Sequence, residues 1–225
     1  MKRISLILAL CLTAGTVLAQ DEWKDRSVPA IGKEYPHADY MLYTNKADAL
    51  ADKYSDSEFF KSLNGKWNFL FADDFRDLPK GFENPSFDDS AWKKLDVPAN
   101  WEINGYGTPI YINSPFEWSP DSGGKEPSFP EIISGGQYRV KFTVPASWTG
   151  RQVFIQFGGM KSCAWIYLNG HKVGYTEDSK DPAEFNLTPY LKSGENVLAV
   201  EIHRWSTGSF YECQDFWRLS GIERD

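Results

Sequence analysis

Residues 137–175, QYRVKFTVPASWTGRQVFIQFGGMKSCAWIYLNGHKVGY, decide the fold of this chain. Apolar and polar residues alternate through residues 139–144, which predicts a strand with one buried face. The runs at residues 153–157 and 163–168 are richer in aromatic and branched side chains. We therefore expect these two runs to be inner strands of a two-sheet stack, covered on both faces.

A tight turn joins the last two segments of this stretch. Asn169 and Gly170 tolerate the positive φ angles of a two-residue type I′ turn, so WIYL and HKVGY are expected to pair as a hairpin. The hairpin leads directly into the polar segment TEDSK at residues 176–180. This segment is the first candidate for a functional loop.

The rest of the chain adds further strand patterns and one long irregular region. Alternating apolar residues predict strands at residues 66–71 and 195–204. Residues 99–133 carry aromatic side chains among glycines and prolines without a regular period, and residues 182–190 are expected to be a connecting turn with one helical turn at most. These patterns predict an all-β fold, an antiparallel β-sandwich of the jelly-roll type with about eight strands.

The amino terminus has the pattern of a secretory signal peptide at residues 1–19. A basic start precedes the apolar run at residues 4–12, and small or compact residues lead to Ala19, where we expect cleavage. The alternative is a membrane anchor, but the run is short for a span and no comparable run recurs. Cys11 lies inside the run, which disfavours a lipid anchor. A periplasmic or secreted product is therefore expected, without a membrane partner.

Residues 20–62 are expected to form an extended arm ahead of the β-sandwich at residues 63–225. Apolar and aromatic residues occur singly in the arm without a sustained period, which is typical of a segment lying across another surface. A short helix is expected within residues 45–60, capped by Thr44 or Asn45.

Composition excludes some classes of function. The chain of 225 residues has a formal net charge of −7, and 16% of its residues are aromatic, so it can bury a sizeable core and is a poor partner for nucleic acid. With three histidines and no CxxC or HxxxH spacing, a zinc site is disfavoured. Cys163 and Cys213 could form one disulfide, or Cys163 could be a buried thiol within a strand.

Several motifs occur in order and together resemble one family. They are NGKWNF at residues 64–69, VPANWEINGYGTPIYIN at 97–113, LNGHKVGYTEDS at 168–179 and SGIERD at 220–225. The chain from about Trp23 onward resembles the amino-terminal sugar-binding domain of the large β-galactosidases of glycoside hydrolase family 2. The resemblance implies a galactose-binding-domain-like jelly roll.

The resemblance also implies two site residues. Asn113 resembles the asparagine that reaches the galactose pocket from this domain. Asp178 resembles the aspartate that contacts a galactose hydroxyl and helps to hold a sodium ion, and a carboxylate suits both roles. On the residues alone, Asp178 is better explained as a solvated turn residue, and Asn113 as a turn amide before a Ser-Pro pair.

The catalytic groups are expected to lie elsewhere. Retaining glycoside hydrolysis needs two carboxyl groups, which the family places in a (β/α)₈ barrel with a magnesium ion close by, and the sequence has no strand–helix alternation that predicts a barrel. We therefore expect a fragment or truncated gene product that is inactive alone. Four carboxylates near the aromatic segments are interpreted as surface or interdomain hydrogen-bonding groups: Glu177, Glu184, Glu212 and Asp215.

Three hypotheses follow. The first is the amino-terminal domain of a retaining β-galactosidase acting on terminal β-galactosides, with the remaining enzyme domains as partners and a homo-oligomer left open. The second is a free-standing carbohydrate-binding module, which requires aromatic rings on one exposed face. The third is a structural interaction domain with an exposed apolar patch and no sugar affinity. Glucuronide or mannoside specificity within the same family stays open.

Overall fold

The computed structural model describes residues 21–113, 118, 128–212 and 215–225. The expected signal peptide at residues 1–19 and Cys213 lie outside these residues. Cys163 is a free, buried thiol, which agrees with the second of the two interpretations of this cysteine. Within the described ranges, no helix is long and apolar enough to cross a membrane.

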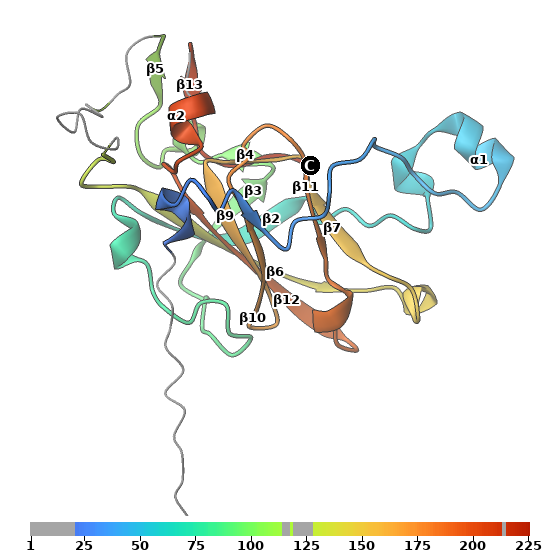
Figure 1. Cartoon of the computed structure of the whole chain (residues 1–225). Helices are drawn as coiled ribbons and strands as arrows, with labels where there is room; N and C mark the ends of the chain where they lie inside the picture. Colours follow the sequence, from blue (N-terminus) through green and yellow to red (C-terminus); the bar gives the residue numbers. More distant parts are fainter. Residues whose placement is uncertain (1–20, 114–117, 119–127, 213–214) are drawn as a thin grey trace, which may run out of the picture.

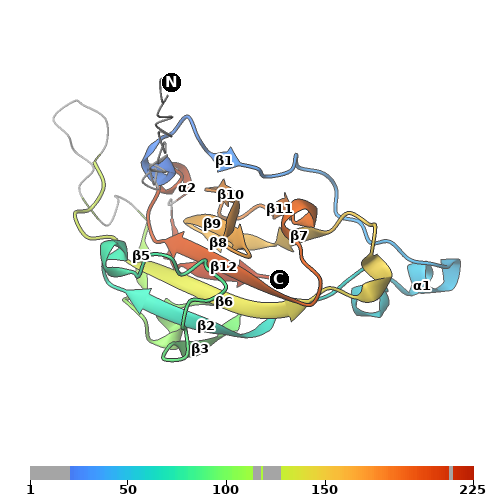
Figure 2. The same cartoon turned by 90° about the horizontal axis from the view of Figure 1, so that it is seen from below.

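A seven-stranded antiparallel sheet forms the larger layer of the molecule (Figures 1 and 2). The long central strands lie side by side in Figure 2, with the arm at one edge of the sheet. In spatial order, the strands are β1 (Ala30–Ile31), β10 (His171–Thr176), β9 (Cys163–Leu168), β12 (Glu195–His203), β6 (Gly135–Thr143), β2 (Gly65–Ala72) and β3 (Lys93–Val97).

Three smaller antiparallel sheets complete the architecture. Side chains from the first two of them share a hydrophobic cluster with the large sheet, so they form the second layer of a sandwich. The predicted antiparallel β-sandwich is thus confirmed. The small sheets are β11 (Ala183–Asn186) with β7 (Phe154–Phe157); β4 (Ala99–Asn100) with β14 (Gly221–Arg224) and β8 (Gly159–Lys161); and β13 (Phe216–Arg218) with β5 (Ile110–Ile112).

The predicted hairpin is present. Asn169 has φ 54° and Gly170 has φ 88°, and the turn that they form joins β9 to β10 with His171 opposite Leu168. Both residues adopt the left-handed conformation that a two-residue type I′ turn requires. The hairpin carries the chain from the centre of the large sheet towards its edge and ends beside the polar loop at residues 177–180.

The strand at residues 153–157 is present as β7, but its expected burial on both faces was wrong, and so was the expected turn at residues 182–190. β7 alternates exposed and buried residues, with Phe154 39% exposed, because it belongs to a two-stranded sheet that is covered on one side only. Residues 182–190 are more than a turn, since they contain β11, which pairs along its length with β7. Polar Glu184 and Asn186 alternate there with buried Phe185, a pattern too short to stand out from a loop.

Arg139 also differs from its expected place on a solvent-facing side of β6. It is 1% exposed, because the loop between β2 and β3 covers this face of the sheet. Its Nε donates to Asp89 Oδ2 at 2.7 Å, and its guanidinium also donates to the carbonyls of Phe82 and Asn84.

The arm combines an extended strand with a short helix. β1 adds to the sheet beside β10, with Ala30 opposite Thr176. The short helix α1 (Lys46–Ala51) begins at Asn45, whose side chain accepts from the Asp48 amide at 2.9 Å, as the capping pattern predicts. Both views show α1 standing away from the body of the sandwich.

Candidate functional site

Asp178 lies just beyond the end of β10. Its side chain is 48% exposed, and Oδ2 lies 3.5 Å from Nζ of Lys33 in the arm. The residues on either side, Glu177 and Ser179, are buried. The loop therefore presents one carboxylate to solvent while the residues that flank it are anchored in the protein.

Glu177 anchors the loop through hydrogen bonds inside the domain. Its carboxylate accepts from Tyr175 Oη at 2.7 Å, from Thr207 Oγ1 at 2.5 Å and from the Gly208 amide at 2.6 Å. Burial raises the pKa of the Glu177 carboxyl, and these hydrogen bonds oppose the rise. The expectation of a surface or interdomain role for Glu177 was wrong, because the side chain is 4% exposed and is bonded within the domain.

A group of buried serines lies beneath the same loop. Ser162 Oγ is 2.6 Å from Ser206 Oγ and 2.9 Å from Ser209 Oγ, and Ser179 Oγ donates to the Ser162 carbonyl at 3.4 Å. Ser209 opens the short helix α2 (Ser209–Glu212). The serines thus link the Asp178 loop to α2 through buried hydrogen bonds.

Asn113 lies directly after β5 and is exposed. The residue before it, Ile112, pairs with Phe216 of β13, and the Ile112 carbonyl accepts from Arg218 Nη2 at 3.0 Å. Arg218 itself is 1% exposed. A buried guanidinium therefore holds the backbone at the point where Asn113 leaves the strand.

Phe216 connects the surroundings of the two predicted site residues. Its ring centroid lies 5.0 Å from Lys180 Nζ and 5.6 Å from Lys161 Nζ, within cation–π range. Lys180 is two residues from Asp178, and Phe216 is the strand partner of Ile112. Both predicted site residues therefore belong to the end of the sandwich where β5, β13 and α2 lie (Figure 1).

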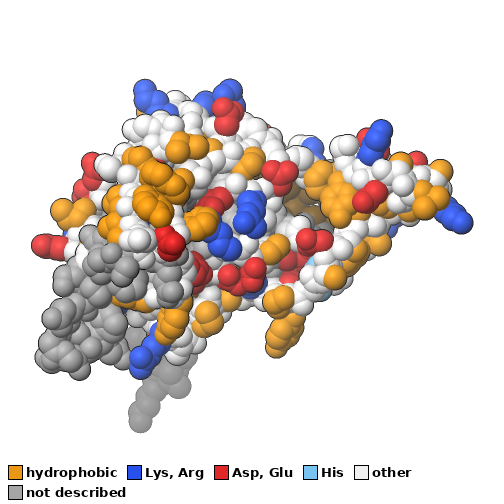
Figure 3. Space-filling model, turned by 90° about the horizontal axis from the view of Figure 1, so that it is seen from above, with side chains coloured by type: hydrophobic (Ala, Val, Ile, Leu, Met, Phe, Trp, Pro, Cys, Tyr) orange, Lys and Arg blue, Asp and Glu red, His pale blue; other side chains and the backbone are white. Residues whose placement is uncertain are grey.

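Charged side chains of both signs gather on this end. Viewed from above Figure 1, acidic and basic groups lie near the middle of the face, among patches of hydrophobic side chains (Figure 3). The hydrophobic side chains on the β5–β13 ribbon include Tyr111 and Trp217, which are 53% and 51% exposed, with ring centroids 5.5 Å apart. Exposed aromatic rings beside carboxylate and amide groups suit the binding of a sugar, whose C–H face stacks on the rings.

The other three carboxylates have separate partners. Glu184 Oε1 lies 3.3 Å from His37 Nε2, and Asp215 accepts from Tyr111 Oη at 2.7 Å. Glu212 accepts from the Ser179 amide at 3.1 Å, and burial raises the pKa of its carboxyl. Sequence reasoning missed the buried cations Lys161 and Arg218, because their contacts with Trp217 and Ile112 join segments that are far apart in the chain.

A metal ion requires a set of several ligands. No group of three or more histidine, cysteine, aspartate or glutamate side chains comes together in the part of the chain that the structure describes. Asp178 offers an exposed carboxylate with Lys33 Nζ at 3.5 Å. Such a hard oxygen ligand fits an alkali cation as one member of a larger ligand set.

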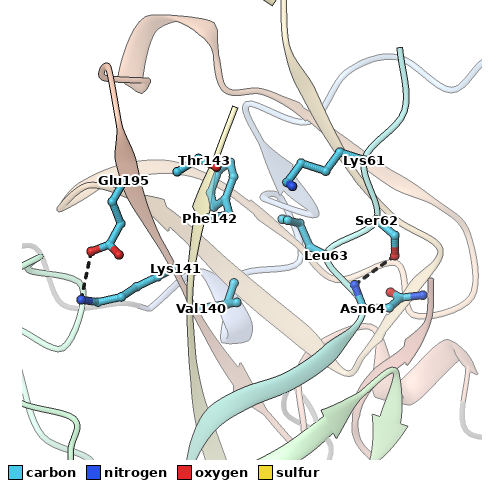
Figure 4. Close-up of a pocket in the computed structure, with 9 residues that line it drawn as sticks. All are labelled: Lys61, Ser62, Leu63, Asn64, Val140, Lys141, Phe142, Thr143 and Glu195. Atoms are coloured by element: carbon cyan, nitrogen blue, oxygen red, sulfur yellow. Dashed lines mark hydrogen bonds and ion pairs between the residues drawn. The ribbon is translucent and has the colours of Figure 1, made fainter. Parts of the chain in front are cut away.

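A separate open groove of about 380 Å³ lies at the opposite end of the large sheet (Figure 4). Residues 61–64 and residues 140–143 of β6 line it, together with Glu195, which forms an ion pair with Lys141 at 3.0 Å. Glu195 is at the start of β12, whereas His203 at the end of β12 is near the Asp178 loop. The groove is therefore distinct from the candidate site.

Comparisons with known proteins agree on one family. The family described as glycosyl hydrolases family 2, sugar binding domain, matches residues 60–225. A β-galactosidase of Priestia megaterium is 39% identical over 206 residues, which are 91% of this chain and 20% of that protein. A β-galactosidase of Vibrio cholerae is 36% identical over 209 residues, 93% of this chain and 20% of that protein. The chain thus spans about a fifth of the length of these curated relatives.

The fold has a counterpart among solved structures. A β-glucuronidase of Bacteroides uniformis matches with a TM-score of 0.55 and 24% identity, over 73% of this chain and 17% of that one. At this identity, the match supports the fold alone.

Proposed function

The chain belongs to glycosyl hydrolase family 2, as its sugar-binding domain, and we propose that it forms one edge of a β-galactoside-binding site. Asn113 and Asp178 would contact the sugar. One observation carries the proposal: both side chains are exposed at the same end of the sandwich, and each is next to a backbone group that accepts from or donates to a charged side chain of the domain, Arg218 or Glu212.

The chemistry of these groups suits a galactoside. An ionised carboxylate accepts strongly from a sugar hydroxyl, and an amide both donates and accepts. Tyr111 and Trp217 would add a stacking surface for the sugar ring or its aglycone. In the complete site, Asp178 would also be one ligand of a sodium ion, with the other ligands supplied from outside this domain.

The reaction itself is assigned to other domains of the full-length enzyme, a retaining β-galactosidase. Its two catalytic carboxyl groups would be about 5–5.5 Å apart, as covalent retaining hydrolysis requires. They and the magnesium ion would belong to a barrel domain, so this chain supplies substrate contacts without catalytic residues. Cleavage of a signal peptide at residues 1–19 would direct the enzyme to the periplasm or outside the cell.

A titration of the isotopically labelled chain with methyl β-galactoside, followed by NMR, tests the proposal. Because the site is incomplete, we expect a Kd on the order of millimolar, with the largest shifts at Asn113 and Asp178. Asp178→Asn should weaken binding about tenfold or more, since it removes a charge-assisted hydrogen bond. Asp96→Asn is the matched control, because Asp96 is exposed on β3, where it pairs with Lys66.

Three results would separate the alternatives. No shift at any sugar concentration, or binding unchanged in Asp178→Asn, contradicts the proposal. Submillimolar binding centred on Tyr111 and Trp217 instead favours a free-standing carbohydrate-binding module, which their exposed rings make the second candidate. Turnover of a chromogenic galactoside by the chain alone would overturn the assignment of catalysis to other domains.

A further inference from the structure

One short segment of the chain holds the backbone beside both proposed sugar contacts. Glu212 ends α2, and Arg218 ends β13 six residues later. Glu212 accepts from the amide of Ser179, next to Asp178, and Arg218 donates to the carbonyl of Ile112, next to Asn113. The two contacts are charge-assisted and reach parts of the sequence that are otherwise far apart.

Glu212 is hydrogen-bonded to the Asp178 loop through one of its two carboxylate oxygens. Oε1 accepts from the Ser179 amide at 3.1 Å, while Oε2 is buried without a hydrogen-bond partner among the described residues. A buried, half-satisfied carboxylate costs free energy. Its position is therefore poorly explained by stability alone.

Arg218 has the corresponding place beside Asn113. Arg218 is 1% exposed, and its guanidinium donates to the carbonyls of Ile112 on β5 and Phe216 on β13. It therefore cross-links the two strands of the β5–β13 ribbon. A buried cation is also expensive, and apolar residues of similar volume would often pack at least as stably. What the guanidinium provides is a fixed, forked donor geometry.

We propose that Glu212 and Arg218 are positioning residues that set the relative placement of Asp178 and Asn113. This inference rests on the proposed function. We call these two residues the clamp: Glu212 at the end of α2 accepts from the backbone beside Asp178, and Arg218 at the end of β13 donates to the backbone beside Asn113. Since misplacing a contact by about 1 Å can cost as much as a hundredfold in rate in a complete enzyme, the clamp determines how well the edge fits the sugar.

Amide hydrogen exchange, measured without sugar, tests directly whether Glu212 holds the loop that carries Asp178. In Glu212→Ala, the Ser179 amide loses its acceptor and should exchange about tenfold faster or more, because the loop opens locally. In Glu212→Gln, the side-chain amide oxygen can still accept, and protection of Ser179 should be kept. Unchanged protection in Glu212→Ala contradicts the clamp whether or not the chain binds sugar.

Galactoside affinity, measured by the same NMR titration, tests the consequence for the site. Glu212→Ala and Arg218→Met should weaken binding about tenfold, while Glu212→Gln should stay within about threefold and Arg218→Lys should be intermediate, because lysine keeps the charge without the fork. The structural control is Val197→Ala, a buried change in β12, which should lower Tm and leave Kd unchanged.

The outcomes separate the two claims. If the wild-type chain binds galactoside through Asp178 and both clamp variants bind it with wild-type Kd, the clamp is wrong and the proposed function stands. If Val197→Ala weakens binding as much as Glu212→Ala at an equal loss of Tm, the effect is general destabilisation, which also overturns the clamp. If the wild type does not bind, the proposed function fails, and the exchange of Ser179 still decides whether Glu212 holds the loop.

Discussion

Both faces of β12, a central strand of the large sheet, are buried, but different groups cover them. On β12, Leu198, Val200 and Ile202 pack into the apolar cluster between the two layers. The alternate residues Glu201 and His203 are 1% and 0% exposed on the other face. There, Gln137 Nε2 donates to Glu201 Oε2 at 2.7 Å, and His203 Nε2 donates to Glu201 Oε1 at 2.9 Å.

The two faces carry different residues because different elements cover them. The apolar face meets side chains of the smaller sheets, whereas the polar face meets a loop, which brings backbone carbonyls and single charges along with its aromatic rings. Arg139 satisfies the Phe82 and Asn84 carbonyls and pairs with Asp89. A charged residue can therefore be a core residue where the covering element is irregular, because buried carbonyls need donors.

Arg139→Ala should have the largest effect on stability. It leaves Asp89 without its cation and leaves two carbonyls without donors, so we expect a loss of about 3–5 kcal/mol in the free energy of unfolding. Urea unfolding measures this loss. If Arg139→Ala lowers the free energy of unfolding by less than Leu198→Ala, a substitution on the apolar face, the hydrogen bonds of Arg139 contribute less to stability than we expect.

Leu198→Ala tests the apolar face by creating a cavity. Leu198 is fully buried between the two layers, and truncation should cost about 2–5 kcal/mol, depending on how far the neighbours relax. The same urea measurement applies. Because Leu198 packs into the apolar cluster, away from the titratable groups of the polar face, this variant should show no new dependence on pH, and a pH-dependent loss would contradict the separation of the two faces.

His203 gives the polar face its own dependence on pH. Burial lowers the pKa of His203 below 6.5, against the opposing effect of Glu201 and, more weakly, Asp74, while Lys80 adds to the lowering. Below pH 6.5, His203 is protonated in the unfolded chain but stays neutral in the folded chain. The free energy of unfolding therefore falls as the pH drops, by at most about 1.4 kcal/mol per pH unit.

The comparison of wild type with His203→Gln isolates this effect. Unfolding free energies measured from pH 7.5 down to pH 5 should converge as the pH falls, because glutamine does not titrate. Buried carboxyl groups with raised pKa act in the opposite direction, but equally in both proteins. Parallel pH profiles would contradict this, because they would mean that the pKa of His203 is the same in the folded and the unfolded chain.

Lys141→Ala should have the smallest effect. Lys141 lies two residues from Arg139 on β6, but its side chain is 58% exposed, and its partner Glu195 is 57% exposed. An ion pair so open to solvent contributes less than about 1 kcal/mol. The same unfolding assay applies, and an effect comparable with that of Arg139→Ala would contradict the assignment of Lys141 to the surface.

The sequence predicts the strands better than it predicts what covers them. Alternation locates β2, β6 and β12, and the Asn169-Gly170 pair locates the hairpin, because these signals are local. The burial of Arg139 and Glu201 is missed, since it depends on a loop more than 40 residues away in the chain. β11 is missed because its four residues are half polar.

In the candidate site, too, some residues are found from the sequence and others only from the folded structure. Asn113 and Asp178 are found through motifs shared with a family, and on the residues alone both also fit ordinary turns. Their roles in sugar binding stay predictions. Glu212 and Arg218 cannot be found in this way, because only the folded chain brings them beside Ser179 and Ile112.

The outermost strands of the large sheet have a consequence for solubility. β1 is only two residues long and comes from the arm, while β3 exposes Lys93, Lys94 and Asp96 along the other border. Short and charged edge strands hinder strand-by-strand self-association, because a second molecule finds few open backbone groups and meets charges. Proteolytic loss of the arm would uncover β10, His171–Thr176, as a template for aggregation.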